Sequence, residues 1–139
     1  MGLYSEQVLP SSAEGATASG RDPAVLEKMI EVKVAYDVDR DRAMEDTKIW
    51  AALALPADAK AGIDDPREME RLARDVENVA HRRWLVSDNP DEHIEQFRTY
   101  LALGFHHLIF HSPGNEQARF LELYGSQTLP RIRARRGWR

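Results

Sequence analysis

The sequence contains no cysteine, which excludes disulfide bonds, thiolate chemistry and cysteine-ligated zinc sites. It also lacks any run of about 20 apolar residues, the length that a membrane-spanning helix needs. The first thirty residues contain no basic region followed by an apolar run, so they do not resemble a signal peptide. From these absences we expect a cytoplasmic protein that has no membrane partner.

Neither sign of charge dominates, since 19 Lys and Arg residues stand against 23 Asp and Glu residues, a net charge of −4. This balance gives no electrostatic reason to expect nucleic-acid binding. The basic run at residues 131–139 is interpreted as a solvated helix end, because no second basic segment accompanies it. A compact chain of 139 residues would form one domain that buries about 68–70% of its unfolded surface.

Periodicity and capping signals predict helices at residues 3–19, 39–53, 57–82 (as several short helices), 91–103 and from about 115 onward. We expect Asp37 or Asp39 to cap the second of these. The pairs Asp65-Pro66 and Asn89-Pro90 each place a capping residue before a proline at the first helical position. Glu92 is predicted to complete a capping box with Asn89. Pro130 should kink or divide the last helix.

The buried sides of the two terminal helices follow from their apolar residues. In the first helix we expect Leu3, Val8 and Leu9 to be buried. In the last helix the predicted buried residues are Phe120, Leu121 and Tyr124.

Two segments, residues 29–36 and 106–111, are predicted strands. In the first, four apolar side chains alternate with Glu31 and Lys33, so the two charged residues share one face. A parallel strand is usually apolar on both faces, and the charged face is therefore predicted to point into the lumen of a barrel. Strands that alternate with helices indicate an α/β fold, but two strands are too few to close a barrel.

About seventy residues separate the two predicted strands, which is typical of a functional insertion at the C-terminal face of a barrel. Within it Lys60 and Arg83 are candidates to hold an anionic group, because Arg grips phosphate in bidentate fashion and Lys supplies a compact charge. The alternative is that both are solvated or bridge neighbouring carboxylates such as Asp64 and Asp65.

The histidines give only one candidate for a ligand contact, His111, which stands at the C-terminal end of the second strand. His107 shares its strand face, but no third ligand follows at a recognisable spacing, so we expect no metal site. His81 and His93 are expected at the surface. Trp50 and Trp84 are interpreted as packing residues, although Trp84 adjoins Arg83 and would line the same pocket in the alternative interpretation.

Several segments resemble, in order, the C-terminal portion of coenzyme F420-dependent glucose-6-phosphate dehydrogenases, which belong to the luciferase-like monooxygenase superfamily. These segments are KMIEVKVAYD, IWAALALPADAKAGIDDPREME, RRWLVSDNPDEHIEQFRTYLALGFHHLIFHSPGNEQARFLELY and LPRIR. The barrel ending is shared across that superfamily, whereas the segment from Trp50 to Trp84 is specific to the sugar-phosphate enzymes. The similarity extends from Leu3 to about Arg135.

The resemblance implies a partial TIM barrel at residues 3–136, the end of a luciferase-like (β/α)8 barrel. Residues 29–36 and 106–111 would be its seventh and eighth strands, with an insertion at residues 37–90. Residues 84–87 would be a lead into the seventh helix rather than a strand. The family binds its sugar phosphate with a Lys and an Arg that match Lys60 and Arg83.

The same resemblance implies that this chain lacks the family's catalytic residues and those that hold coenzyme F420. We therefore expect an inactive C-terminal fragment that does not bind F420. Its intact form would oxidise glucose 6-phosphate and pass a hydride to F420. The alternatives are a luciferase-like oxidoreductase with another substrate, F420- or flavin-dependent, and a non-catalytic association module. The expected partner is a second copy of the chain or a missing N-terminal half.

Overall fold

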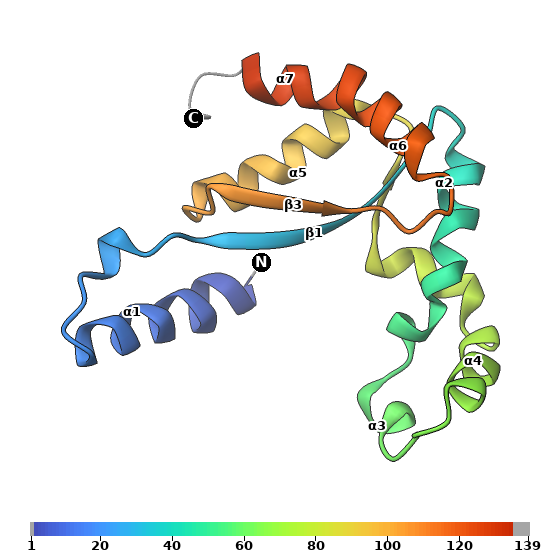
Figure 1. Cartoon of the computed structure of the whole chain (residues 1–139), viewed down its shortest axis with the longest axis horizontal. Coiled ribbons are helices and arrows are strands. Elements are labelled where there is room, and N and C mark those ends of the chain that lie inside the picture. Colours follow the sequence, from blue (N-terminus) through green and yellow to red (C-terminus); the bar gives the residue numbers. More distant parts are fainter. Residues whose placement is uncertain (1, 135–139) are drawn as a thin grey trace.

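The computed structural model describes residues 2–134 and places three parallel strands in one sheet. The strands are β1 (Met29–Tyr36), β2 (Leu85–Ser87) and β3 (His107–His111), in the order β2-β1-β3. The α-helices are α1 (Leu9–Ala18), α2 (Arg40–Asp46), α3 (Ala57–Lys60), α4 (Pro66–Arg74), α5 (Pro90–Ala102), α6 (Gln117–Leu123) and α7 (Leu129–Ala134). Figure 1 shows α5, α6 and α7 on one side of β1 and β3. The predicted α/β class is confirmed.

The third strand corrects the sequence prediction, which treats residues 84–87 as a lead into a helix. Leu85–Ser87 pairs with the second half of β1, with Val34 opposite Leu85 and Tyr36 opposite Ser87. Three residues are too few to show a period of two, and the pairing depends on a partner about fifty positions away. Because β1 is paired on both sides, the free edges within the described residues belong to β2 and β3.

One face of β1 forms the core, as the alternation predicts. Ile30, Val32, Val34 and Tyr36 are 0–6% exposed. Side chains of α5 and of the C-terminal helices cover them, namely Ile94, Phe97, Tyr124 and Ile132. This face therefore supplies most of the hydrophobic stabilisation of the chain.

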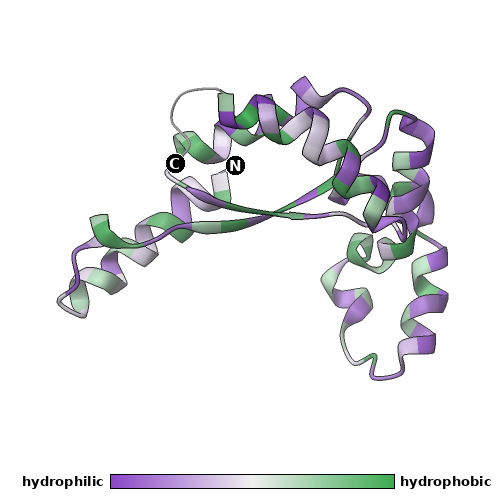
Figure 2. Ribbon diagram, turned by 45° about the horizontal axis from the view of Figure 1, so that its top comes forward, coloured by the Kyte–Doolittle hydropathy of each residue, from purple (hydrophilic) through white to green (hydrophobic). Residues whose placement is uncertain are grey.

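The opposite face of the sheet is open to solvent over its N-terminal part, whereas at its C-terminal end Ala35 is buried against Ala43 and Trp84. It carries Glu31 and Lys33 from β1 and His107, Ile109 and His111 from β3, and Ile109 is 43% exposed. Figure 2 shows the C-terminal helices on the other side of the strands. The chain exposes 9269 Å², about a quarter more than the roughly 7,400 Å² typical of a compact protein of its mass. Parallel sheets are normally covered on both faces, so the N-terminal part of this face is unpartnered among the described residues.

Three of the apolar residues predicted to be buried in the terminal helices are exposed. Leu3 is 60%, Val8 40% and Leu121 67% exposed, because no described element covers these sides of the helices. Leu9 and Phe120 pack against the core as predicted, and Tyr124 is buried.

Both terminal helices contain a five-residue π-helical segment directly before a Leu-Pro pair. The segments are Tyr4–Val8 and Tyr124–Thr128. In each, the leucine N–H bonds to the carbonyl oxygen of Tyr4 or Tyr124, five residues back. A proline ring clashes with the carbonyl four residues earlier in an α-helix, and the wider turn avoids this contact. The predicted interruption at Pro130 is thus confirmed; residues 135–136 of the predicted helix lie outside the described chain, as does most of the basic run.

Helix α5 begins at the predicted cap but not with the predicted capping box. The Asn89 side chain accepts a hydrogen bond from the Asp91 N–H at 3.0 Å. The Glu92 carboxylate accepts from the Ser87 hydroxyl at 2.6 Å, and that hydroxyl accepts from the Asn89 N–H at 2.9 Å. The Ser87 hydroxyl therefore bridges the Glu92 carboxylate and the Asn89 N–H, two groups that bond directly to each other in a capping box.

The predicted helix at 39–53 is confirmed only in its first half. Asp39 caps α2 by accepting from the N–H groups of Asp41 and Arg42. The chain then turns into a 3₁₀ segment, Thr47–Ala54, which is kinked at Trp50. This segment packs against α4 and a second 3₁₀ segment, Glu77–Arg83. Together with α3 they form a projection away from the sheet (Figure 1).

No helix of the described residues has the length and apolar character needed to cross a bilayer.

Candidate functional site

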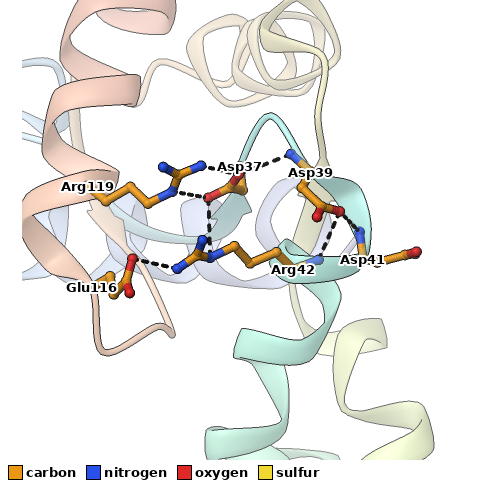
Figure 3. Close-up of polar contacts among 6 residues, drawn as sticks. All are labelled: Asp37, Asp39, Asp41, Arg42, Glu116 and Arg119. Carbon is orange, nitrogen blue, oxygen red and sulfur yellow. Dashed lines mark hydrogen bonds and ion pairs between the residues drawn. The ribbon is translucent and has the colours of Figure 1, made fainter.

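The loops after β1 and β3 meet at the C-terminal edge of the sheet, where Asp37 joins them. Arg119 of α6 donates to both carboxylate oxygens of Asp37, from Nε at 2.6 Å and from Nη2 at 2.8 Å. Arg42 lies 3.9 Å from the same carboxylate and donates to Glu116 at 2.6 Å. Figure 3 shows this network of side chains from α2 and α6 around Asp37.

Asp37 is only 3% exposed, and its charge is stabilised locally. The hydrogen bond from Arg119 lowers its pKa, burial opposes this effect, and the backbone N–H of Asp39 lowers the pKa further. An ionised carboxylate with these partners has few acceptor positions left for a ligand. We therefore interpret the network as a clamp that fixes the two loops, not as a binding site.

At Gly114 the loop after β3 passes close to the side chain of Asp46, beside this clamp. A Cβ atom at this position would overlap the carboxylate of Asp46 at the end of α2. Burial raises the pKa of Asp46. A larger residue at position 114 would therefore have to displace the Asp46 side chain.

On the open face of the sheet, three polar side chains form a second cluster. Lys33 donates to Oε1 of Glu31 at 2.6 Å, and Nδ1 of His111 lies 3.3 Å from the same oxygen. The hydrogen bond from Lys33 lowers the pKa of Glu31, and His111 contributes to the same effect. The predicted placement of Glu31 and Lys33 on one strand face is confirmed, and the structure shows that they pair and that His111 joins them.

Two indole rings enclose the imidazole of His111. The ring centroid of Trp50 lies 4.9 Å away and that of Trp84 5.1 Å away, both in edge-to-face arrangements. The Trp50 indole N–H donates to the carbonyl of Pro113 at 3.2 Å, which ties the projection to the loop after β3. Trp84 is buried as predicted, whereas Trp50 is 41% exposed and is only partly a packing residue.

Arg83 and Lys60 lie in different parts of the projection. Arg83 is exposed, ends the second 3₁₀ segment and directly precedes Trp84. Lys60 is half-buried at the end of α3, which Figure 1 shows at the far end of the projection from the sheet. Neither forms an ion pair with any residue in the described part of the chain, and Asp65 pairs with Arg67 instead. No contact in this part of the chain joins the two cations.

His93 is the clearest correction to the predicted distribution of histidines. It is expected at the surface but is 0% exposed, between Tyr36 and Tyr124. Its Nδ1 lies 3.3 Å from the Tyr124 hydroxyl, and burial lowers its pKa to about 4. Tertiary packing decides this position, because a single histidine on a helix carries no sequence signal of burial.

His107, in contrast, is exposed and lies 3.5 Å from Glu27. Across the described residues there is no group of three His, Asp or Glu side chains arranged to hold a metal ion.

Comparisons with known proteins give homologues over nearly the whole chain. An F420-dependent glucose-6-phosphate dehydrogenase from Nakamurella multipartita is 54% identical over 133 residues, 95% of this chain and 39% of that protein. Proteins of the same name from Beutenbergia cavernae and Rhodococcus jostii are 53% and 49% identical, each over 96% of this chain and 40% of the relative. No protein-family model matches the sequence.

A solved structure, an F420-dependent secondary alcohol dehydrogenase in complex with an F420-acetone adduct, superposes with a TM-score of 0.71 at 22% identity. The match covers 89% of this chain and 38% of that structure. At this identity the likeness bears on the fold alone.

The resemblance inferred from the sequence is confirmed. This chain is homologous to a C-terminal portion of proteins named F420-dependent glucose-6-phosphate dehydrogenase. It spans about 40% of the length of the curated relatives it matches.

Proposed function

We propose that the chain is the C-terminal part of an F420-dependent oxidoreductase that oxidises glucose 6-phosphate and passes a hydride to F420. The identity of 54% over 95% of the chain carries this proposal. In this proposal β1 and β3 are the seventh and eighth strands of a luciferase-like barrel, and residues 37–90 are an insertion between them. The open face of the sheet supports this assignment, because in a closed barrel it would face the lumen.

Lys60 and Arg83 are the proposed ligands of the substrate phosphate. What supports them is their lack of an ion-pair partner in the described chain, since an anion-binding cation must be available to its ligand.

The charged clusters at the C-terminal edge and on the open face of the sheet do not fit coenzyme F420. The charged groups at the C-terminal edge, Asp37, Arg42 and Arg119, are neutralised by one another and by Glu116. On the open face, Glu31 already pairs with Lys33. An anionic deazaflavin would need unpaired cations, and in this proposal the unpaired Lys60 and Arg83 are taken by the substrate phosphate. We therefore propose that residues outside this chain hold F420 and that the chain alone is inactive.

Complementation tests the function directly. The loss of F420 fluorescence in the presence of glucose 6-phosphate is followed for the purified chain and for the chain co-expressed with the complementary 60% of the Nakamurella multipartita relative. We expect no reduction of F420 by the chain alone and measurable reduction by the pair. Activity of the chain alone would contradict the proposed inactivity, and an inactive but co-purifying pair would contradict the proposed reaction.

Replacing Arg83 tests the phosphate grip. In the complemented enzyme, Arg83→Ala should raise the KM for glucose 6-phosphate by about 10- to 100-fold, because it removes a charge-assisted hydrogen bond of about 1.5–3 kcal/mol. Arg82→Ala, an exposed neighbour, is the matched control and should leave the KM unchanged. Equal KM values for the two variants would favour an uncharged substrate such as a secondary alcohol.

The unpartnered sheet face favours association as a second, non-catalytic function. Met29, Ile109 and Trp50 are 41–56% exposed on or beside this face, and such apolar surface usually marks an interface. Light scattering after gel filtration should therefore show a dimer or a larger assembly. A monomer with a compact hydrodynamic radius would contradict this candidate.

A further inference from the structure

We propose that His111, Glu31 and Lys33 form a subsite for sugar hydroxyl groups, with the indole of Trp50 as its stacking surface. This inference rests on the proposed function, because it names what holds the sugar beyond its phosphate. The three polar residues belong to the open face of the sheet, and Trp50 is joined to them by its contact with His111.

The free atoms of the cluster match the hydrogen-bonding needs of a diol. Glu31 accepts from both neighbours through Oε1, which leaves Oε2 as an acceptor. An ionised carboxylate cannot donate, so Nδ1 of His111 carries a proton, and in the tautomer that has only this proton Nε2 is an acceptor. Lys33 has three N–H groups and uses one. Each sugar hydroxyl both donates and accepts, so adjacent acceptors and donors suit adjacent hydroxyl groups.

The aromatic wall distinguishes this cluster from an ordinary surface ion pair. Trp50 remains 41% exposed although its N–H is held by Pro113. The face of an indole held in this way suits the apolar C–H face of a sugar ring, while its orientation is fixed before binding. Trp84 holds the other side of His111 and directly follows Arg83. Arg83, the proposed phosphate-binding residue, and His111 of the hydroxyl subsite would thus both adjoin Trp84.

The same strand provides a matched comparison. His107 lies four residues before His111 on the same face and also approaches a glutamate, Glu27, at 3.5 Å. It has no aromatic ring contact among the described residues, and its side chain is 55% exposed against 26% for His111. If the histidine–glutamate pair alone mattered, replacing His107 and replacing His111 should have the same effect on sugar binding. The proposed subsite predicts an effect at His111 only.

Titration of the purified chain tests this subsite. Histidine ring signals are followed by NMR spectroscopy while glucose 6-phosphate or inorganic phosphate is added to the wild-type chain and to His111→Ala, His107→Ala and Glu31→Gln. We expect glucose 6-phosphate to bind about tenfold more tightly than inorganic phosphate and to shift the His111 signals. His111→Ala and Glu31→Gln should remove this preference, and His107→Ala should keep it.

Three outcomes would overturn the subsite: equal affinity for the two probes, equal effects of the His111 and His107 variants, or no saturable binding of glucose 6-phosphate. If His111→Ala fails to fold, as judged from its amide spectrum, Glu31→Gln decides. A failed subsite is distinguishable from a failed function, because F420 reduction by the complemented enzyme and its dependence on Arg83 are measured separately.

Discussion

The two faces of β1 carry the same backbone but opposite chemistry. On one face Ile30, Val32, Val34 and Tyr36 are almost completely buried under helices, and on the other Glu31 and Lys33 pair with each other beside solvent. The helix-covered face holds the chain together by apolar burial. The open face contributes little to stability, since exposed ion pairs are worth about 0–1 kcal/mol, and is therefore free to serve binding.

The largest expected difference between the faces is in core packing. Phe97→Ala should lower the free energy of unfolding by about 3–5 kcal/mol. Phe97 is 1% exposed, and the centroid of its ring lies 4.9 Å from that of Phe110. Ile109→Ala on the open face is the control and should cost less than about 1 kcal/mol. Urea unfolding measures both. Similar losses would mean that the open face is buried in solution.

Buried His93 and exposed His107 should differ in their effect on the free energy of unfolding as the pH falls. The unfolded chain binds a proton at His93 near pH 6.5, but the folded chain does so only near pH 4. Unfolding therefore takes up a proton between these values, and stability should fall by about 3 kcal/mol as the pH is lowered from 6.5 to 4.

The stability of His93→Phe, measured by urea unfolding at several pH values, should lose this dependence, and that of His107→Phe should keep it. If the two variants show the same pH profile, buried His93 is not the group that titrates.

Two carboxylates, Asp37 directly after β1 and Glu31 on its open face, should give a smaller difference in stability. Asp37→Asn should lower stability by about 2 kcal/mol, because it breaks the paired hydrogen bonds to Arg119 at a buried position. Glu31→Gln, at an exposed pair, should change stability by less than about 1 kcal/mol. Thermal unfolding at low and high salt measures both. An equal and salt-sensitive loss would show that the clamp at Asp37 is solvated.

Local sequence signals predicted much of the secondary structure. The alternation of β1, the caps at Asp39, Asp65 and Asn89, and the interruption at Pro130 were all confirmed. Each depends on residues within a few positions of one another, so the sequence contains the whole cause.

The failures concern contacts between distant segments. Burial of His93 depends on Tyr124, 31 positions away, and the exposure of Leu121 depends on which side of the last helix the core occupies. Residue type and helical period do not contain this information.

The candidate site was predicted only in part. Lys60, Arg83 and His111 were named from the sequence, and the first two remain a proposal. Trp50 as a partner of His111, and Glu31 as its acceptor, were not predicted. The signal that could have pointed to Glu31 was present, since a charged face on a parallel strand is unusual.

The sequence by itself determined where β1 lies, where α2, α4 and α5 begin, and which residues of β1 face each way, because neighbouring residues decide capping and side-chain alternation. Tertiary structure alone decided that Leu85–Ser87 joins the sheet. It also brought Glu31 against His111, 80 positions away, and Asp37 against Arg119, 82 positions away. The reason is physical: these contacts form only when β1 and β3 pair and their following loops meet at one edge of the sheet.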